Sequence, residues 1–261
     1  MLEAKTEKEL EAIREGGRIL SQIIGELAKA VRPGIGTGEL ERMALDMMSE
    51  AGGQPSFKGY GGSRKVKPFP TAICASLNHE VVHGFSLPSK TVRDGDLLKI
   101  DAGLRYRGCY TDMAVTVGAG KVGAREIELA RVTREALILG VEQVRHGAWV
   151  SDIGKAIDRH VRRHGFSTVK DLVGHGVGRA VHEDPQIPNY LDRRSAPIRL
   201  FRNLVLAIEP MVNMGGEEVN CENDGWTVTT ADRSLSAHFE MTVIVGQDGP
   251  EIVTPLPDFF A

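Results

Sequence analysis

The sequence predicts an α+β fold in which two similar halves are packed around one shared sheet. The stretch 97–117 consists of two β-rich runs around a turn, and pairs of amphipathic helices are expected before and after it. The chain also repeats itself, because Val31–Gly34 matches Val144–Gly147 at an offset of 113 residues (144 minus 31) and Gly52 falls on Gly165. A chance similarity is the alternative, since the match is short.

The composition is that of an ordinary globular protein, with 41% hydrophobic and 26% charged residues in a chain of 261. The net charge of −3 argues against DNA or other wholesale nucleic-acid binding. No apolar run approaches the ~18 residues of a membrane span, and no signal peptide is recognisable, so no membrane partner is expected. Cys74, Cys109 and Cys221 are odd in number and far apart, which predicts reduced thiols and a cytoplasmic location.

Two helices are expected at the start of the chain. Thr6–Glu9 has the form of a capping box, and apolar residues keep helical spacing to about Val31, before Pro33-Gly34 stops the helix. Thr37 is expected to cap the second helix, which ends at Gly52-Gly53.

A Gly-rich loop is expected over residues 55–70. It contains the basic patch Ser63–Lys67, which is interpreted as a solvated segment, with contact to RNA or another acidic surface, such as a ribosome, as the alternative. One or two short strands are expected from Thr71 to Phe85.

The second half is expected to contain two further helices, from about Ala124 to Val144 and from about Ser151 to His164. The glycines of Asp171–Pro185 indicate a turn or a close backbone approach. Leu204–Pro210 and His238–Val245 are apolar strands, each with a carboxylate near one end.

Two aspartates of the hairpin indicate a binding site. If the hairpin turns about Tyr106-Arg107, Asp101 lies directly opposite Asp112, with Cβ atoms roughly 5 Å apart on one face. Carboxylates this close repel each other, so shared protons or cations must compensate. Cations are favoured because the chain supplies three further candidate ligands, His175, Glu209 and Glu240. An ordinary hairpin with two exposed aspartates is the alternative.

The segment His79–His83 matches H-E-x-x-H but is not expected to hold zinc. That motif needs a helix, whereas the flanking residues and the two internal valines indicate a strand. On a strand the two histidines would lie ~13 Å apart, too far to bind one metal. His83 can still contribute individually.

The segment Gly118–Gly123 matches G-x-G-x-x-G between a strand and a helix. A dinucleotide site also needs a second parallel strand after that helix, whereas here another helix follows. A glycine-rich turn is therefore the simpler interpretation.

At the candidate ligands the sequence resembles the type I methionine aminopeptidases. The resemblance covers nearly the whole chain and rests on these segments: Asp101-Ala102-Gly103, Tyr110-Thr111-Asp112, Gly174–Gly178, His182–Pro185, Ile208-Glu209-Pro210 and Ser234–Glu240. It implies a pita-bread fold, with a curved antiparallel sheet and outer helices, formed by residues 1–261 as a single catalytic metallopeptidase domain. The short separation of His182 and Glu209, 27 positions, leaves no room for the helical insert of the type II enzymes.

The resemblance implies two divalent metal ions. Asp112 and Glu240 would bridge them, Asp101 would complete one coordination sphere, and His175 with Glu209 would complete the other. Oxygen-rich ligation with one imidazole suits Mn, Fe(II) or Co, and Zn remains compatible. A water bridging two such ions loses a proton near neutral pH and becomes a hydroxide nucleophile.

The resemblance also implies roles around the metals. Glu209 would act as a proton shuttle, His182 would stabilise the oxyanion, and His83 would contact the scissile or following amide. The residues implied for the methionine pocket are Phe57, Tyr60, Cys74, Val181 and Trp226. Two departures from the family pattern affect this pocket, because Ser63–Lys67 lengthens its rim and Val181 replaces a larger side chain.

The expected function is metal-dependent removal of the N-terminal methionine from nascent proteins and peptides, with a preference for a small second residue. The enzyme is expected to be a monomer whose substrate is a peptide N-terminus, with a ribosome contact through the basic patch as a further hypothesis. One alternative is a related proline-specific peptidase, although these usually carry an extra N-terminal domain. A partner-binding or RNA-binding protein and a metal-free hydrolase of the same fold are disfavoured, because all five ligands are present.

Overall fold

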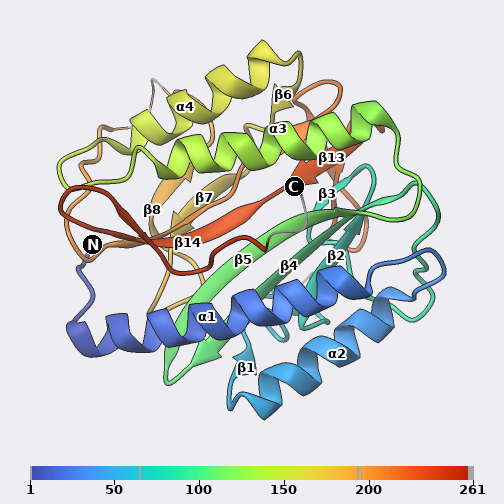
Figure 1. Ribbon diagram of the computed structural model, residues 1–261, viewed down its shortest axis with the longest axis horizontal. Helices are drawn as coiled ribbons and strands as arrows, with labels where there is room; N and C mark the ends of the chain where they lie inside the picture. Colours follow the sequence, from blue (N-terminus) through green and yellow to red (C-terminus); the bar gives the residue numbers. More distant parts are fainter. Residues whose placement is uncertain (1, 65, 193, 195, 258–261) are drawn as a thin grey trace.

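Helix pairs and antiparallel strands alternate along the chain (Figure 1). The computed structural model describes residues 2–64, 66–192, 194 and 196–257. Its helices are α1 (Glu7–Ala30), α2 (Thr37–Glu50), α3 (Ala124–Val141) and α4 (Val150–Arg163). Its strands are β1 (Gln54–Pro55), β2 (Ile73–Leu77), β3 (Glu80–Val82), β4 (Leu97–Tyr106), β5 (Cys109–Gly118), β6 (Ser167–Thr168), β7 (Val173–Gly176), β8 (Glu183–Pro188), β9 (Val205–Ile208), β10 (Met211–Asn213), β11 (Val219–Cys221), β12 (Val228–Thr230), β13 (Ser236–His238), β14 (Glu240–Val245) and β15 (Pro250–Ile252).

One large antiparallel sheet carries the fold. Its strands follow the order β1-β4-β5-β14-β9-β7-β8, with β2 also paired to β4 and β15 to β14. Two small sheets have the orders β13-β10-β6 and β11-β12-β3. In Figure 1 the helices lie in front of the large sheet, with α1 beside α2 and α3 beside α4. This arrangement confirms the predicted α+β class with an antiparallel sheet and outer helices.

Alternation along the central strands separates a core face from a second face. Met241 and Val243 on β14, and Val115 on β5, are buried in the main hydrophobic core with side chains of the helices. Since successive residues of a strand point to opposite faces, Glu240 and Asp112 point away from that core. The helix-covered face therefore provides stability, and the opposite face carries the polar groups.

The helix ends follow the predicted signals with one exception. Thr6 and Glu9 form the capping box of α1, with the Thr6 amide donating to the Glu9 carboxylate at 2.7 Å. The predicted cap at Thr37 is wrong, because Gly36 is the N-cap residue and Thr37 is the first residue of α2. The Thr37 hydroxyl instead donates to the Leu87 carbonyl at 3.0 Å and accepts from the Leu87 amide at 2.9 Å. The hydroxyl therefore bonds to a residue distant in sequence and not to the backbone of the first turn of α2.

The hairpin of β4 and β5 turns one residue later than predicted. Asp101 lies opposite Ala114, so the prediction that Asp101 directly opposes Asp112 is wrong. The turn residues are Arg107, with φ 47°, and Gly108, with φ 84°, which together form the type I′ geometry that favours glycine. Because the register differs by two positions, both aspartates remain on the same face.

The turns after α1 and α3 make equivalent hydrogen bonds. Gly34 has a φ of 91° and its amide donates to the Val92 carbonyl at 2.8 Å. Gly147 has a φ of 81° and its amide donates to the Leu200 carbonyl at 2.8 Å. The repeat found in the sequence therefore corresponds to the same local structure in both helix pairs.

The two misleading motifs adopt the structures that the sequence indicated. Residues 79–83 surround β3, and positive φ values at Asn78 and His83 are incompatible with a helix there. Gly118–Gly123 is the turn between β5 and α3. All three cysteines are free thiols, and no helix in the described ranges is both long and apolar enough to cross a membrane.

Candidate active site

Three of the candidate ligands project from adjacent strands of the large sheet. Asp101 on β4 and Glu240 on β14 both pair with Ala114 of the intervening strand β5. Asp112 lies two residues before Ala114 and therefore points to the same face. The sheet thus brings the three carboxylates together although they are separated by up to 139 positions (240 minus 101).

The other two ligands come from the second half of the sheet. His175 pairs with Ala207 on β9, and Glu209 follows two residues later on the same face. Glu209 Oε1 lies 3.4 Å from His175 Nε2. His175 Nδ1 lies 2.9 Å from the Gly176 carbonyl oxygen, which can only accept, so Nδ1 carries the hydrogen. The lone pair of Nε2 is therefore free to bind a metal.

The arrangement of these five side chains fits a divalent-metal centre. Asp112, His175 and Glu240 each offer a ligand atom within 4.8 Å of the others. Asp101 Oδ1 and Glu240 Oε1 are buried and have no hydrogen-bond partner among the described residues. Buried polar atoms require partners, and carboxylate oxygens with one imidazole suit Mn, Fe, Co or Zn.

Burial raises the pKa of all four carboxyl groups. Burial, followed by the charge of Glu209, raises the pKa of Asp101 to about 8, and a hydrogen bond from the Cys74 thiol partly offsets this. Burial is also the largest cause of the raised pKa values of Asp112, Glu209 and Glu240, and charges on neighbouring carboxyl groups add to it. Four ionised carboxylates at this site therefore need cations to balance them.

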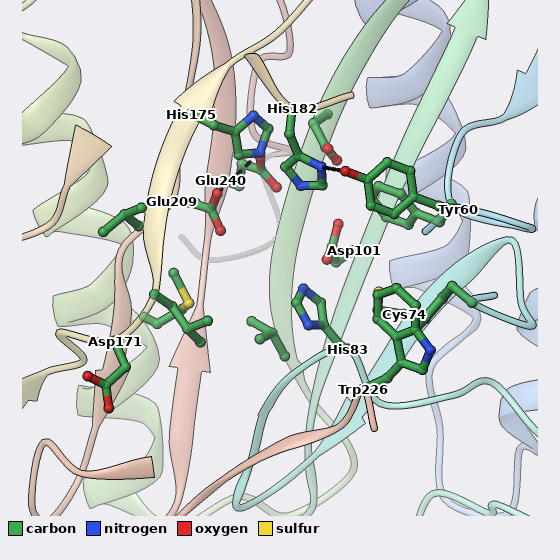
Figure 2. A pocket seen from close by; sticks show the side chains of 17 residues that line it. Tyr60, Cys74, His83, Asp101, Asp171, His175, His182, Glu209, Trp226 and Glu240 are labelled. Atoms are coloured by element: carbon green, nitrogen blue, oxygen red, sulfur yellow. Dashed lines mark hydrogen bonds and ion pairs between the residues drawn. The ribbon is translucent and has the colours of Figure 1, made fainter. Parts of the chain in front are cut away.

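His182 lies beside the ligand group and is oriented by a tyrosine. Its Nδ1 lies 2.7 Å from the hydroxyl of Tyr60, and its ring centroid lies 4.4 Å from that of His175 (Figure 2). Removal of water around the ring lowers the pKa of His182. A lowered pKa favours the neutral imidazole, and the tautomer in which Nδ1 accepts a hydrogen bond from the Tyr60 hydroxyl has Nε2–H as a donor.

His83 lies at the end of β3 and faces the same space (Figure 2). Burial, followed by the charge of His182, lowers the pKa of His83 to about 4. Its ring makes an edge contact with Trp226, at a centroid distance of 6.4 Å. His83 is therefore a second neutral imidazole in the site.

A cavity of about 280 Å³ connects these histidines with an apolar wall. Of the residues predicted for the pocket, Phe57, Tyr60, Cys74 and Trp226 line this cavity. Val181 is not among its lining residues, and it packs behind them in the same apolar cluster. Figure 2 shows Tyr60, Cys74 and Trp226 together on one side of the cavity.

Several lining residues were missed by sequence reasoning. Phe69 makes edge contacts with Phe57 and Trp226, at centroid distances of 6.4 and 5.4 Å. Leu172 and Met211 add apolar surface to the cavity. The sequence around Phe69 indicated only a loop, so no local pattern could have identified it.

His238 is a further site residue that the sequence analysis did not single out. It is 1% exposed, and its Nε2 lies 3.5 Å from Glu209 Oε2. Burial lowers the pKa of His238 to about 3, so the ring is neutral. Its position two residues before Glu240 was the available signal, because such neighbours share a strand face.

The lengthened rim packs against the pocket wall. Trp226 Nε1 donates to the Lys67 carbonyl at 2.8 Å, and a Cβ on Gly61 would lie 2.7 Å from the Trp226 ring. Arg64 and Lys67 are exposed, whereas Lys65 lies outside the described residues. The inserted segment therefore holds Trp226 in place at the cavity.

The chain resembles known proteins over nearly its whole length. The sequence model of metallopeptidase family M24 matches residues 11–247. Over 254 residues the chain is 43% identical to a methionine aminopeptidase of Clostridium perfringens and 42% identical to methionine aminopeptidase 1 of Bacillus subtilis. Each of these alignments covers 97% of this chain and 99% of the other protein.

Solved structures show the same relationship. The methionine aminopeptidase of Thermotoga maritima matches with a TM-score of 0.92 at 39% identity, covering 97% of this chain and 99% of that one. The prolidase of Pyrococcus furiosus matches with a TM-score of 0.74 at 21% identity, covering 97% of this chain and 66% of that one. The second likeness concerns the fold alone, and both agree with the predicted pita-bread architecture.

Proposed function

The chain belongs to metallopeptidase family M24, and on this premise we propose that it removes the N-terminal methionine from peptides and nascent proteins in a metal-dependent hydrolysis. The observation that carries this proposal is one cavity with two different walls. One wall presents four carboxylates, of which Glu209 is partly exposed, and an imidazole, and the other presents aromatic rings and a thiol. Such a cavity can bind a charged reaction centre and an apolar side chain at the same time.

The metal ligands proposed are Asp101, Asp112, His175, Glu209 and Glu240. Their four carboxylates match the charge of two divalent ions, and Mn, Fe(II), Co and Zn are the candidates. Bound divalent ions would polarise the scissile carbonyl and lower the pKa of a water molecule at this site.

The chain's own groups then position the substrate and move protons. His182, oriented by Tyr60, donates from Nε2 to the oxygen of the scissile carbonyl as negative charge develops there. His83 contacts the scissile or following amide from the other side of the cavity. Glu209, close to His175 and His238, accepts a proton from the water that attacks the carbonyl carbon and returns it to the amine released when the C–N bond breaks.

The apolar wall selects the side chain of the first residue. A methionine thioether is flexible and polarisable and makes favourable contacts with aromatic rings. Phe57, Phe69 and Trp226 supply such rings around Cys74, and Val181 supports them from behind. His83 and His182 line the part of the cavity proposed to hold the scissile bond, so a large second residue would contact their rings and a small one is preferred.

The proposal is tested by the release of methionine from a Met-Ala-initiated peptide, followed by mass spectrometry. Chelated protein should be inactive, and addition of Mn, Fe(II), Co or Zn in parallel samples should restore the loss of one N-terminal methionine. A Met-Leu peptide serves as the matched control for the small-residue preference, and an Ala-Pro peptide tests the proline-specific alternative. Binding of two ions without release from Met-Ala would contradict the proposal.

Replacing His182 by Ala is expected to lower kcat by about 10²- to 10³-fold, because a donor to the developing oxyanion is lost. Metal content should be unchanged, since His182 is not a proposed ligand. Tyr60→Phe should cause a smaller loss, about 10-fold, because the imidazole remains but its tautomer is no longer fixed. Steady-state kinetics and elemental analysis check both variants, and a parallel loss of metal in His182→Ala would show that its role is assigned wrongly.

A further inference from the structure

A second group of potential metal ligands lies between α3 and α4, outside the active-site cavity. Glu135 belongs to α3, His160 belongs to α4, and His164 is the C-cap residue of α4. One ligand atom from each residue lies within 4.8 Å of the other two. All three are partly buried, and nothing in the proposed aminopeptidase reaction uses them.

The two histidines have the helical spacing that metal binding requires. His160 and His164 are four residues apart at the C-terminal end of a helix, so they lie on one face, with ring centroids 4.6 Å apart. The same spacing at His79 and His83 falls around a strand, where it separates the side chains. His160 and His164 therefore have the helical context that one metal ion requires, whereas His79 and His83 do not.

Existing hydrogen bonds orient the ligand atoms. His164 Nδ1 lies 3.0 Å from the His160 carbonyl oxygen, so Nδ1 carries the hydrogen and Nε2 is left with its lone pair. His160 Nε2 lies 3.0 Å from Glu135 Oε2, which can only accept, so Nε2 carries a hydrogen that a bound cation would replace. The other carboxylate oxygen of Glu135 accepts from Arg131 at 2.6 Å, which fixes the carboxylate without using Oε2. Metal ligands are commonly held by such outer partners.

The packing of the two helices makes the geometry rigid. Gly140 allows α4 to approach α3 closely, because a Cβ at this position would lie 2.8 Å from Ile157. Ile153 and Ile157 are fully buried at this contact, one to two turns from the ligands. Zinc bonds of about 2.0–2.1 Å in tetrahedral geometry place ligand atoms roughly 3.3 Å apart. The three ligand atoms lie within 4.8 Å of one another, so their separations would shorten by up to about 1.5 Å when an ion binds.

We propose that Glu135, His160 and His164 form a second metal site that binds one ion of the Zn²⁺ class. Two imidazoles and one carboxylate are an established zinc-ligand set, which leaves a fourth position for water. The ion would tie α3 to α4 in the helical layer, whereas the proposed catalytic ligands lie on the other face of the sheet. Its effect is therefore on stability and not on the reaction.

The test compares zinc content and thermal unfolding in three proteins. The wild type, His164→Gln and His146→Gln are saturated with Zn²⁺, passed through a desalting column and analysed for zinc per chain. His146 is the matched control, because it is an exposed histidine in the connection between α3 and α4 and is not part of the cluster. We expect His164→Gln to contain one equivalent less than the wild type, and His146→Gln to equal it.

A second variant separates loss of the site from loss of the fold. Glu135→Gln keeps the size of the side chain and should also lose one equivalent of zinc. At 100 times the dissociation constant, Zn²⁺ should raise the Tm of the wild type by about 5 °C more than that of either variant. Equal zinc content in the wild type and in a folded His164→Gln or Glu135→Gln protein overturns the proposal. Methionine release measured with Mn should be the same in all four proteins, so this result is independent of the proposed function.

Discussion

Replacing Asp112 by Asn is expected to lower methionine release from a Met-Ala peptide by at least about 10³-fold. Asp112 interacts with several members of the proposed ligand set, because its ligand atom lies within 4.8 Å of those of His175 and Glu240 and its charge raises the pKa of Glu209. An amide of the same size is a poorer ligand for hard divalent ions and carries no charge to balance them. The measurements are kcat with saturating Mn and the number of metal ions bound per chain.

The control for this substitution is Asp171→Asn. Asp171 also lines the cavity but is exposed, and Figure 2 shows it apart from the other carboxylates. We expect this variant to retain its metal and most of its activity. Full activity in Asp112→Asn would exclude the proposed bridging role, and equal losses in both variants would point to a general effect of charge in the cavity.

Removing the metal is expected to make stability depend steeply on pH. In the metal-free protein the folded state keeps protons on the four buried carboxyl groups, since their pKa values are raised, that of Asp101 to about 8. The unfolded chain releases these protons near pH 4, so the folded state binds more protons than the unfolded state between pH 4 and 8. The free energy of unfolding therefore falls as pH rises through this window.

Buried bases change the size of the effect at each pH. Burial lowers the pKa values of His83 and His175 to about 4 and that of His238 to about 3. Below pH 6.5 these histidines stabilise the folded state increasingly as pH rises, which partly cancels the destabilisation caused by the carboxyl groups. Above pH 6.5 their contribution is constant. Burial also lowers the pKa of Lys99 to about 7, which offsets one carboxyl group above that pH. The net loss of stability should therefore be clearest between pH 6.5 and 8, where the contribution of the histidines no longer changes.

The measurement is the Tm of chelated and Mn-loaded protein at pH 6.5 and pH 8. Bound cations keep the carboxylates ionised in the folded state, so the loaded protein should show little change over this interval. Asp112→Asn supplies the internal control, because removing one carboxyl group should flatten the pH dependence of the metal-free protein. Parallel curves for chelated and loaded protein would contradict this account.

Local patterns were sufficient for much of the fold. The capping box at Thr6 and Glu9, the glycines that follow α1 and α4, and the rejection of a helix at residues 79–83 all depend on neighbours within a few positions. The five candidate ligands were also predicted from sequence, because their motifs and spacing resemble those of a known family. Such features need no knowledge of what packs against them.

Features that depend on distant partners could not be predicted. The Thr37 hydroxyl bonds to Leu87, fifty positions away, and does not cap α2. Phe69 is part of the pocket wall because it packs against Trp226, which comes from a distant segment. Both contacts are invisible to spacing along the chain. The hairpin register is a different case, because its deciding signal is local: Gly108 adopts the positive φ that a turn about Tyr106-Arg107 would have required of Tyr106.

The sequence by itself determined the fold class, the chemical identity of the candidate ligands and the strand faces on which they lie, since these follow from side-chain type and a period of two. The tertiary structure alone decided which of them meet. It placed Asp101 and Glu240 on either side of Ala114, set Val181 behind the pocket wall, and brought Glu135 of one helix to the histidines of another. The physical reason is that coordination and packing depend on distances in space, which only the pairing of distant segments fixes.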